Sequence, residues 1–154
     1  MLRSNGGVAF ALPQAWQLQA RMGGQWTDDG LVSGEQFGLG GASSVRGYEE
    51  RELGGDIGVS GSVELVTPEL AETLAFSKGS LRLLAFVDAG WVRNRLDTPC
   101  LDNRTECSIS SLGVGARWSY GPAQLRLDIA HALRTASETD QGDTRVHVSF
   151  SYGF

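Results

Sequence analysis

Arg46 is the residue with the clearest potential for specific chemistry in this sequence of 154 residues. It lies in EQFGLGGASSVRGYEERELGG, residues 35–55, a polar stretch with glycines on both sides of the arginine. A loop of this length without secondary structure is uncommon in compact domains and is usually functional or disordered. Arginine presents a planar fork of donors that binds a carboxylate in two places at once. The stretch therefore raises the question of which carboxylate could hold this loop.

Other residues could support different chemistry. His147 and Asp128 could act as an acid–base pair, but neither a nucleophile nor oxyanion donors accompany them. GLGG and ASSVRG lack the Gly-Lys-Ser/Thr and the following helix of a phosphate-binding loop. We predict no catalytic residue, no metal site and no cofactor.

The two cysteines leave two interpretations open. Cys100 and Cys107 have six residues between them, and no histidine lies nearby to complete a metal site. They could form a disulfide clip on an exported loop, or they could be two separate thiols in a reducing compartment.

The composition limits the class of protein. The formal net charge of −5 argues against a nucleic-acid partner. Twelve of the thirteen basic residues are arginines, which are preferred where a cation is buried or paired. The sequence contains no apolar run of about 18 residues that would predict a transmembrane helix, and its first residues do not resemble a signal peptide.

Period-two alternation of apolar and polar residues dominates the sequence and predicts β-strands. In TRVHVSFSYGF, for example, the apolar residues are Val146, Val148, Phe150, Tyr152 and Phe154. Residues near 7–12 predict the end of one more strand. The other predicted strands lie within residues 15–26, 56–66, 80–91, 111–120, 122–130 and 144–154.

The predicted strands are about 10 residues long and carry aromatic residues at the ends of their apolar faces, which is typical of outer-membrane β-barrels. Charged strand residues all share the polar face: Arg21, Glu64, Arg82, Asp88, Arg117, Arg126, Asp128 and Arg145. A soluble antiparallel sheet also alternates and is the alternative. We predict an all-β, antiparallel transmembrane β-barrel in contact with outer-membrane lipid.

The predicted connections differ in length, as they do in this class of barrel. Residues 12–14 and 121–122 predict short periplasmic turns, and 68–79 a longer one. The long polar connections, residues 27–54, 93–109 and 134–143, would lie at the outer end. Cys100 and Cys107 would then be in an oxidising compartment, which favours the disulfide.

Six or seven strands do not complete a single-chain barrel, which has an even number and at least eight. Unpaired strand edges are not tolerated in lipid. The sequence therefore predicts the C-terminal part of a longer protein, with self-association as the alternative.

Three motifs resemble those of two-partner secretion transporters, the TpsB family of haemolysin-activation and filamentous-haemagglutinin secretion proteins. GGASSVRGYEE resembles the lid-loop motif of this family, with Val45, Arg46, Gly47 and Tyr48 as the motif itself. FVDAG, with Phe86, Asp88 and Gly90, resembles the second motif. The terminal VHVSFSYGF resembles a barrel-assembly signal, with Phe150, Tyr152 and Phe154.

The resemblance implies that residues 1–154 are the last strands of a sixteen-stranded outer-membrane barrel, with 27–54 as a lid loop folded into the lumen. Arg46 would be anchored to Asp88, with Glu64 as a competing carboxylate and with Phe86 and Tyr48 packed around the pair. Gly47 would provide positive φ or close approach to the wall. The implied partners are a secreted, unfolded exoprotein and the barrel-assembly machinery, and the implied function is type V two-partner secretion.

Three alternatives remain open from the sequence. A barrel-assembly factor of the BamA or TamA kind shares both internal motifs, although EQF favours TpsB. A barrel enzyme would use His147 and Asp128. A passive porin would leave the paired motifs unexplained.

Overall fold

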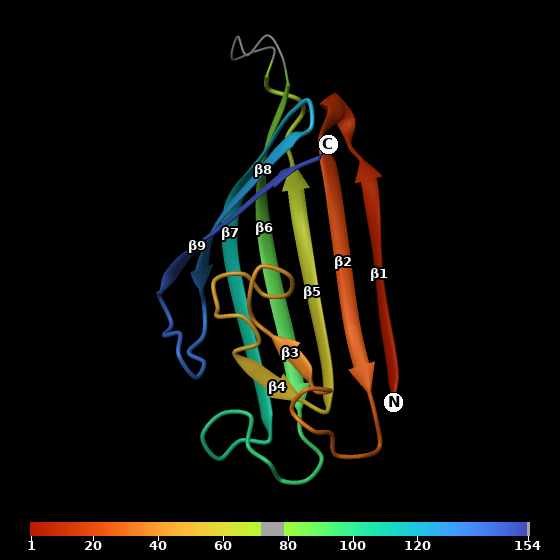
Figure 1. The fold of residues 1–154 in the computed structure, drawn as a ribbon, viewed down its shortest axis with the longest axis vertical. Helices are drawn as coiled ribbons and strands as arrows, with labels where there is room; N and C mark the ends of the chain where they lie inside the picture. The colour runs from red at the N-terminus through yellow and green to blue at the C-terminus, as the bar shows by residue number, and fades with distance from the viewer. Residues whose placement is uncertain (72–78, 154) are drawn as a thin grey trace.

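The computed structural model describes residues 1–71 and 79–153, and the chain is an antiparallel β-sheet protein (Figure 1). Seven long strands form one sheet in the order β1-β2-β5-β6-β7-β8-β9, each paired with the next long strand along the chain. The strands are β1 (Leu2–Ala11), β2 (Gln17–Trp26), β5 (Ile57–Val66), β6 (Ser80–Arg93), β7 (Glu106–Tyr120), β8 (Ala123–Ala132) and β9 (Thr144–Tyr152).

Two strand boundaries correct the sequence prediction. β1 is a full strand from Leu2, because its register with β2 continues from Ala11 back to Leu2. Residues 3–7 of β1, RSNGG, are polar or glycine, so this part of the strand shows no alternation of apolar and polar residues. β7 begins at Glu106 rather than near residue 111, so the connection from β6 is shorter than the predicted 93–109.

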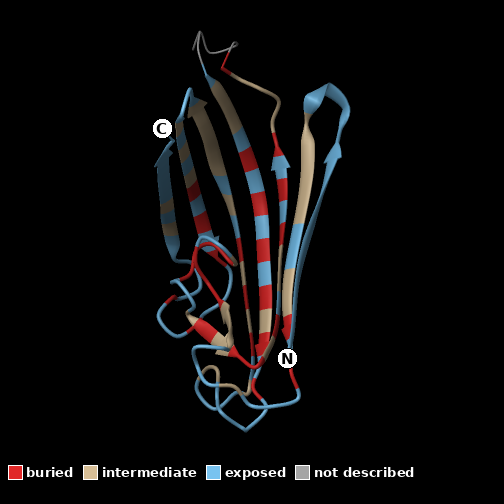
Figure 2. Cartoon of the chain, turned by 45° about the vertical axis from the view of Figure 1, so that its right-hand side comes forward, coloured by how far each residue is buried: buried red, intermediate tan, exposed pale blue. Residues whose placement is uncertain are grey.

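The sheet has two unlike faces. Figure 2 shows buried and exposed bands alternating along the central strands. The exposed apolar side chains include Val8, Phe10, Met22, Val59, Val63, Leu83, Val87, Leu112, Val114, Ile129, Val146, Val148 and Phe150. Soluble monomers rarely expose a continuous apolar surface of this kind. The face that carries these side chains, hereafter the outer face, is therefore suited to contact with lipid.

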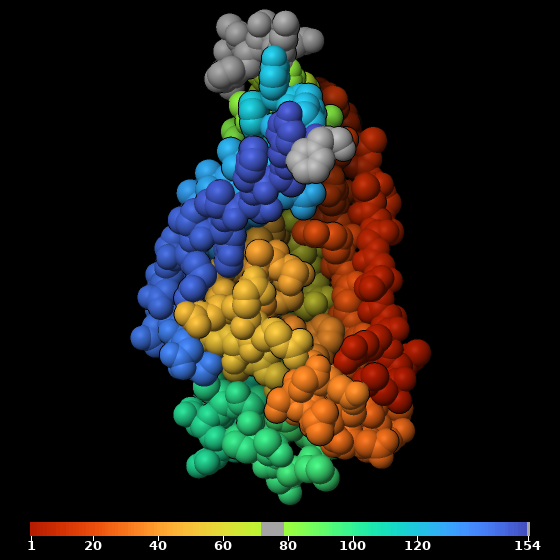
Figure 3. All heavy atoms as spheres, viewed as in Figure 1, coloured from red at the N-terminus to blue at the C-terminus, as the bar shows by residue number. Residues whose placement is uncertain are grey.

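Residues 27–54, hereafter the lid loop, make up most of the connection between β2 and β5 and lie against the opposite, concave face (Figure 1, orange to yellow). The loop was expected to lack regular structure, but β3 (Phe37–Leu39), in its middle, pairs with β4 (Leu53–Gly55) at its end. This pairing closes residues 40–52, which include Arg46, into a compact loop. The space-filling view shows the loop filling the hollow between β9 and the first strands (Figure 3).

The hydrophobic core lies between the lid loop and the sheet. Its buried cluster comprises Leu39, Val45, Tyr48, Leu53, Val92, Cys107, Ile109, Ala132 and Ala136. Burying apolar surface contributes roughly 25 cal/mol per Å², so the loop is held by packing as well as by polar contacts.

β1 and β9 are the two edges of the sheet, and no strand pairing joins them within residues 1–71 and 79–153. One short 3-10 helix, η1 (Pro13–Ala15), forms the turn between β1 and β2. In the described parts of the chain there is no helix of the length and apolar character needed to cross a membrane.

Candidate functional site

The structure brings Arg46 of the lid loop onto Asp88 in the middle of β6. The Arg46 Nε lies 2.7 Å from Asp88 Oδ2, and its Nη2 donates to Oδ1 at 2.8 Å. The backbone N–H of Arg46 also donates to Oδ2, at 3.1 Å. Asp88 is fully buried and Arg46 is 3% exposed. The pair therefore has the two-point geometry expected from the arginine fork, in a site that excludes water.

Two other carboxylates approach the same guanidinium group. The Arg46 Nη1 lies 2.8 Å from Glu64 on β5 and 3.5 Å from Asp128 on β8. Glu64 was expected to compete with Asp88, but the structure shows it on a different nitrogen, so the two bind together. Ser62 accepts a further hydrogen bond from Nη2 at 3.0 Å.

The charges around Arg46 balance. Arg21 lies 2.8 Å from Glu64, and Arg117 binds both oxygens of Asp128, at 2.8 and 3.0 Å. Three guanidinium groups therefore face three carboxylates. Burial lowers the pKa of Arg46, but its hydrogen bond with Asp88 and its charge interactions with Asp88, Glu64 and Asp128 together outweigh burial and raise the pKa above its usual value. Arg46 stays charged.

Phe86 forms the floor under this ion pair. The Arg46 guanidinium carbon lies 3.4 Å from the centre of the Phe86 ring, a cation–π contact. Gly113 on β7 lies directly opposite Phe86 in the sheet. A Cβ added at Gly113 would lie 2.5 Å from Phe86 Cζ and 2.2 Å from the Ile129 carbonyl oxygen. The ring fits beneath Arg46 because Gly113 has no side chain.

Two motif glycines let the lid loop approach the wall. Gly47 has a φ of 96°, and its added Cβ would lie 3.2 Å from Ala130. A Cβ at Gly90 would lie 2.6 Å from Leu39 and 3.2 Å from Val45. Gly90 therefore leaves room for the apolar residues of the loop.

Tyr48 has a different place from the expected one. It does not stack on the ion pair but lies fully buried in the core cluster beside Val45. Its hydroxyl is 2.9 Å from the Ser110 carbonyl and 2.8 Å from the Arg134 carbonyl. Tyr48 thus holds the loop to β7 and to the connection after β8.

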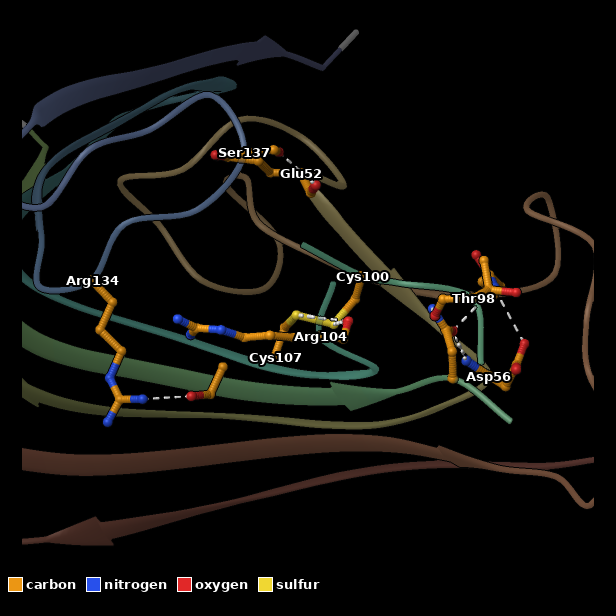
Figure 4. Close-up of a disulfide and its surroundings, with 11 residues drawn as sticks. Glu52, Asp56, Thr98, Cys100, Arg104, Cys107, Arg134 and Ser137 are labelled. Atoms are coloured by element: carbon orange, nitrogen blue, oxygen red, sulfur yellow. Dashed lines mark hydrogen bonds between the residues drawn. A yellow bond between two sulfur atoms is a disulfide. The ribbon is translucent and has the colours of Figure 1, made fainter. Parts of the chain in front are cut away.

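Glu52 joins the lid loop to the connection between β8 and β9. Its carboxylate accepts hydrogen bonds from the backbone N–H groups of Glu138 and Thr139, at 2.8 and 2.7 Å, and from the Thr139 hydroxyl at 2.7 Å. Ser137 donates to the Glu52 carbonyl at 3.1 Å (Figure 4). Burial raises the pKa of Glu52, but these hydrogen bonds outweigh burial and hold the pKa below its usual value.

We expect Glu52→Gln to weaken this contact by about 1 kcal/mol at neutral pH. The NH₂ group of the glutamine side chain would face hydrogen-bond donors in place of a carboxylate oxygen that accepts from them. Because the pKa of Glu52 is lowered in the folded state, its ionised carboxylate stabilises the contact at pH values above the unfolded pKa of about 4.3. This stabilisation is lost as the pH falls through the folded-state pKa. The measurement is hydrogen exchange at the amides of Glu138 and Thr139, corrected for intrinsic pH dependence. The difference between wild type and variant should shrink at acidic pH. Glu106→Gln, which alters an exposed ion pair, is the control, and equal protection in Glu52→Gln and wild type at pH 7 would contradict the expectation.

His147 and Asp128 are cross-strand neighbours, but other groups occupy both. The Gly47 N–H donates to His147 Nε2 at 3.2 Å, and Asp128 binds Arg117. His147 therefore binds the backbone of the lid loop, and Asp128 belongs to the charge network around Arg46. Within the described residues, no three His, Cys, Asp or Glu side chains are grouped to hold a metal ion.

Cys100 and Cys107 are joined by a disulfide (Figure 4). Cys107 belongs to the core cluster beneath the lid loop, and Cys100 packs against that cluster. The bond ties the β6–β7 connection to the core. At the other end of the sheet, Phe150 and Tyr152 are exposed on the outer face of β9, and Phe154 lies outside the described residues.

Sequence reasoning did not identify Ser62 and Gly113 as parts of the site, and it gave Asp128 a different role. Strand alternation places Ser62 and Asp128 on the same face as Asp88, so that pattern could have found them. Glu52 carries no such pattern, because its partners lie in another loop, 86 and 87 residues away.

An antiparallel sheet with an apolar outer face and a charged inner face is typical of the wall of a transmembrane β-barrel. The chain belongs to the family of haemolysin secretion/activation proteins ShlB/FhaC/HecB, which matches residues 3–118. This is a family of transporters, not of enzymes.

Two curated relatives are outer membrane transporters named CdiB, one from Escherichia coli and one from Escherichia coli O6:K15:H31 (strain 536 / UPEC). Each is 37% identical to the chain over 78 residues, which are 49% of this chain and 12% of the relative. The alignment thus spans about one eighth of the length of these relatives.

Proposed function

We propose that the chain forms part of the wall and the lid of an outer-membrane β-barrel that exports a partner polypeptide by two-partner secretion. The observation that carries this proposal is the burial of Arg46 against Asp88 on the charged face of the sheet. A loop anchored there would lie in the path through the barrel. The similarity to transporters named CdiB supports export over an assembly role.

Residues 1–154 would be the C-terminal part of a larger, sixteen-stranded barrel of the family, with residues 27–54 as the lid that folds into the lumen. The apolar outer face would contact lipid, and the polar face would line the pore. The Cys100–Cys107 disulfide suits a loop on the oxidising, outer side. Phe150, Tyr152 and Phe154 would guide insertion by the barrel-assembly machinery.

The charge network suggests how the lid would move. Glu64 and Asp128 each have a second arginine, Arg21 and Arg117, and would stay paired if the lid left. Asp88 has an ion pair only with Arg46 among the described residues. The electrostatic cost of moving the lid would therefore fall mainly on Asp88, and a passing polypeptide would have to offset it.

Photo-crosslinking during export tests this proposal. Gln19 and Met22 lie on the same strand, β2, with Gln19 lining an inner-face cavity and Met22 64% exposed on the outer face. A photo-reactive amino acid at Gln19 of the intact protein should crosslink to the exported polypeptide. The same amino acid at Met22 should crosslink to lipid.

A further inference from the structure

Three arginines, Arg82, Arg117 and Arg126, form a row across the inner face at the end of the sheet away from the lid. The register places Arg82 of β6 opposite Arg117 of β7, and Arg117 opposite Arg126 of β8. In Figure 1 these strand ends lie above the lid loop, near the turn between β7 and β8. Like charges directly opposite each other destabilise an antiparallel pair. An anion bound across the row would relieve this repulsion.

Carboxylates in the described parts of the chain neutralise this arginine row only partly. Arg117 binds Asp128, a carboxylate that also lies 3.5 Å from Arg46. Arg82 lies 3.7 Å from Glu69, and that carboxylate already accepts hydrogen bonds from Ser80 and Leu81.

Arg126 is the least satisfied member of the row. It is exposed, and no hydrogen bond or ion pair joins it to another residue in 1–71 or 79–153. Its guanidinium group is free to bind a ligand.

The arginine row borders a cavity of about 310 Å³ that four arginines line. Its lining residues are Gln19, Arg21, Glu64, Val66, Arg82, Leu84, Arg117 and Arg126, which include four arginines and one glutamate. That glutamate already binds Arg46 and Arg21. The same three arginines of the row line a neighbouring cavity of about 210 Å³. Arg21 and Arg117 are paired with Glu64 and Asp128. Within the described residues, the uncompensated positive charge of this cavity therefore comes from Arg126 and, in part, from Arg82.

We infer that the arginine row binds carboxylate side chains of an acidic, extended segment of the exported polypeptide, as that segment enters from the end opposite the lid. The inference rests on the proposed function. It adds that the segment of the exported polypeptide that enters the barrel first is acidic. Guanidinium forks match carboxylates in two-point geometry. The row crosses three strands, about 10 Å, and alternate side chains of an extended peptide are about 6.6 Å apart. Two successive carboxylates on one side of the peptide therefore reach the row together.

Peptide binding to the intact protein in detergent tests this inference. The probes are fluorescent deca-glutamate and deca-glutamine, measured by fluorescence anisotropy. We expect the acidic peptide to bind about tenfold more tightly at low salt, and the preference to weaken at about 0.5 M salt, where exposed charges are screened. Arg82→Gln combined with Arg126→Gln should remove most of the preference without touching the lid anchor.

The matched control is Arg93→Gln, on the same strand as Arg82 but at its other end, which should keep the preference. Arg126→Lys should keep part of it, because the charge remains without the fork. Equal binding of the two peptides to wild type, or an undiminished preference in the double variant, would overturn the inference. Export of the partner is scored in parallel. If wild type exports the partner but shows no peptide preference, only the inference about the arginine row is wrong. If wild type does not export the partner, the proposed function is wrong.

Discussion

Asp88→Asn in the intact protein is expected to reduce export of the partner polypeptide at least tenfold, while the amount in the outer membrane stays within about twofold. Asparagine keeps the size of the side chain but leaves the buried Arg46 without its closest anion. Breaking a buried pair by removing one partner costs about 3–5 kcal/mol, and about 1.4 kcal/mol corresponds to a factor of ten in an equilibrium. The lid should therefore lose its set position. The measurement is the partner in the medium relative to the protein in the membrane.

Arg21→Gln is the control for this prediction. Arg21 also belongs to the charge network, through Glu64, but its side chain is 60% exposed. Exposed pairs contribute about 0–1 kcal/mol, so export should change by less than about fivefold. Normal export by Asp88→Asn would show that the Arg46–Asp88 pair is not needed for export. A loss from the membrane equal to the loss of export would assign Asp88 to folding alone.

Gly113→Ala is expected to have the second large effect. The new methyl group would overlap the Phe86 ring and the Ile129 carbonyl oxygen, and overpacking of this kind costs about 1–3 kcal/mol. The ring would move from beneath Arg46. We expect a lower free energy of unfolding in urea and weaker export.

Gly61→Ala is the matched control, because its added Cβ would lie 3.6 Å from its nearest neighbour, the Arg21 carbonyl oxygen, which is an ordinary contact distance. It should change the free energy of unfolding by less than about 0.5 kcal/mol. Equal unfolding of the two alanine variants would show that Phe86 tolerates a side chain at Gly113.

The sheet was predictable from the sequence because period-two alternation is a local property. β5, β6, β8 and β9 begin and end within two residues of the predicted limits. β1 was less visible, since small and polar residues interrupt its pattern. β7 was predicted too short, since its apolar residues change face: Cys107 and Ile109 are buried, whereas Leu112 and Val114 are exposed.

The site was predictable only in part. Alternation put Asp88 and Glu64 on the inner face, and the motif resemblance pointed Arg46 toward them. The simultaneous contact of Arg46 with three carboxylates depends on strand register and on the path of the lid loop. The place of Tyr48 in the core depends on the connection after β8. Such loop-to-loop contacts leave no periodic trace in the sequence.

Crosslinking from Gln19 and from Met22 shows whether the inner face of this sheet lines the path of an exported polypeptide. Both sites are on β2, so both variants probe one strand in one membrane. We expect polypeptide adducts from Gln19 that disappear when the partner is not made, and lipid adducts from Met22 in either case. Polypeptide adducts from Met22, or lipid adducts from Gln19, would contradict this expectation.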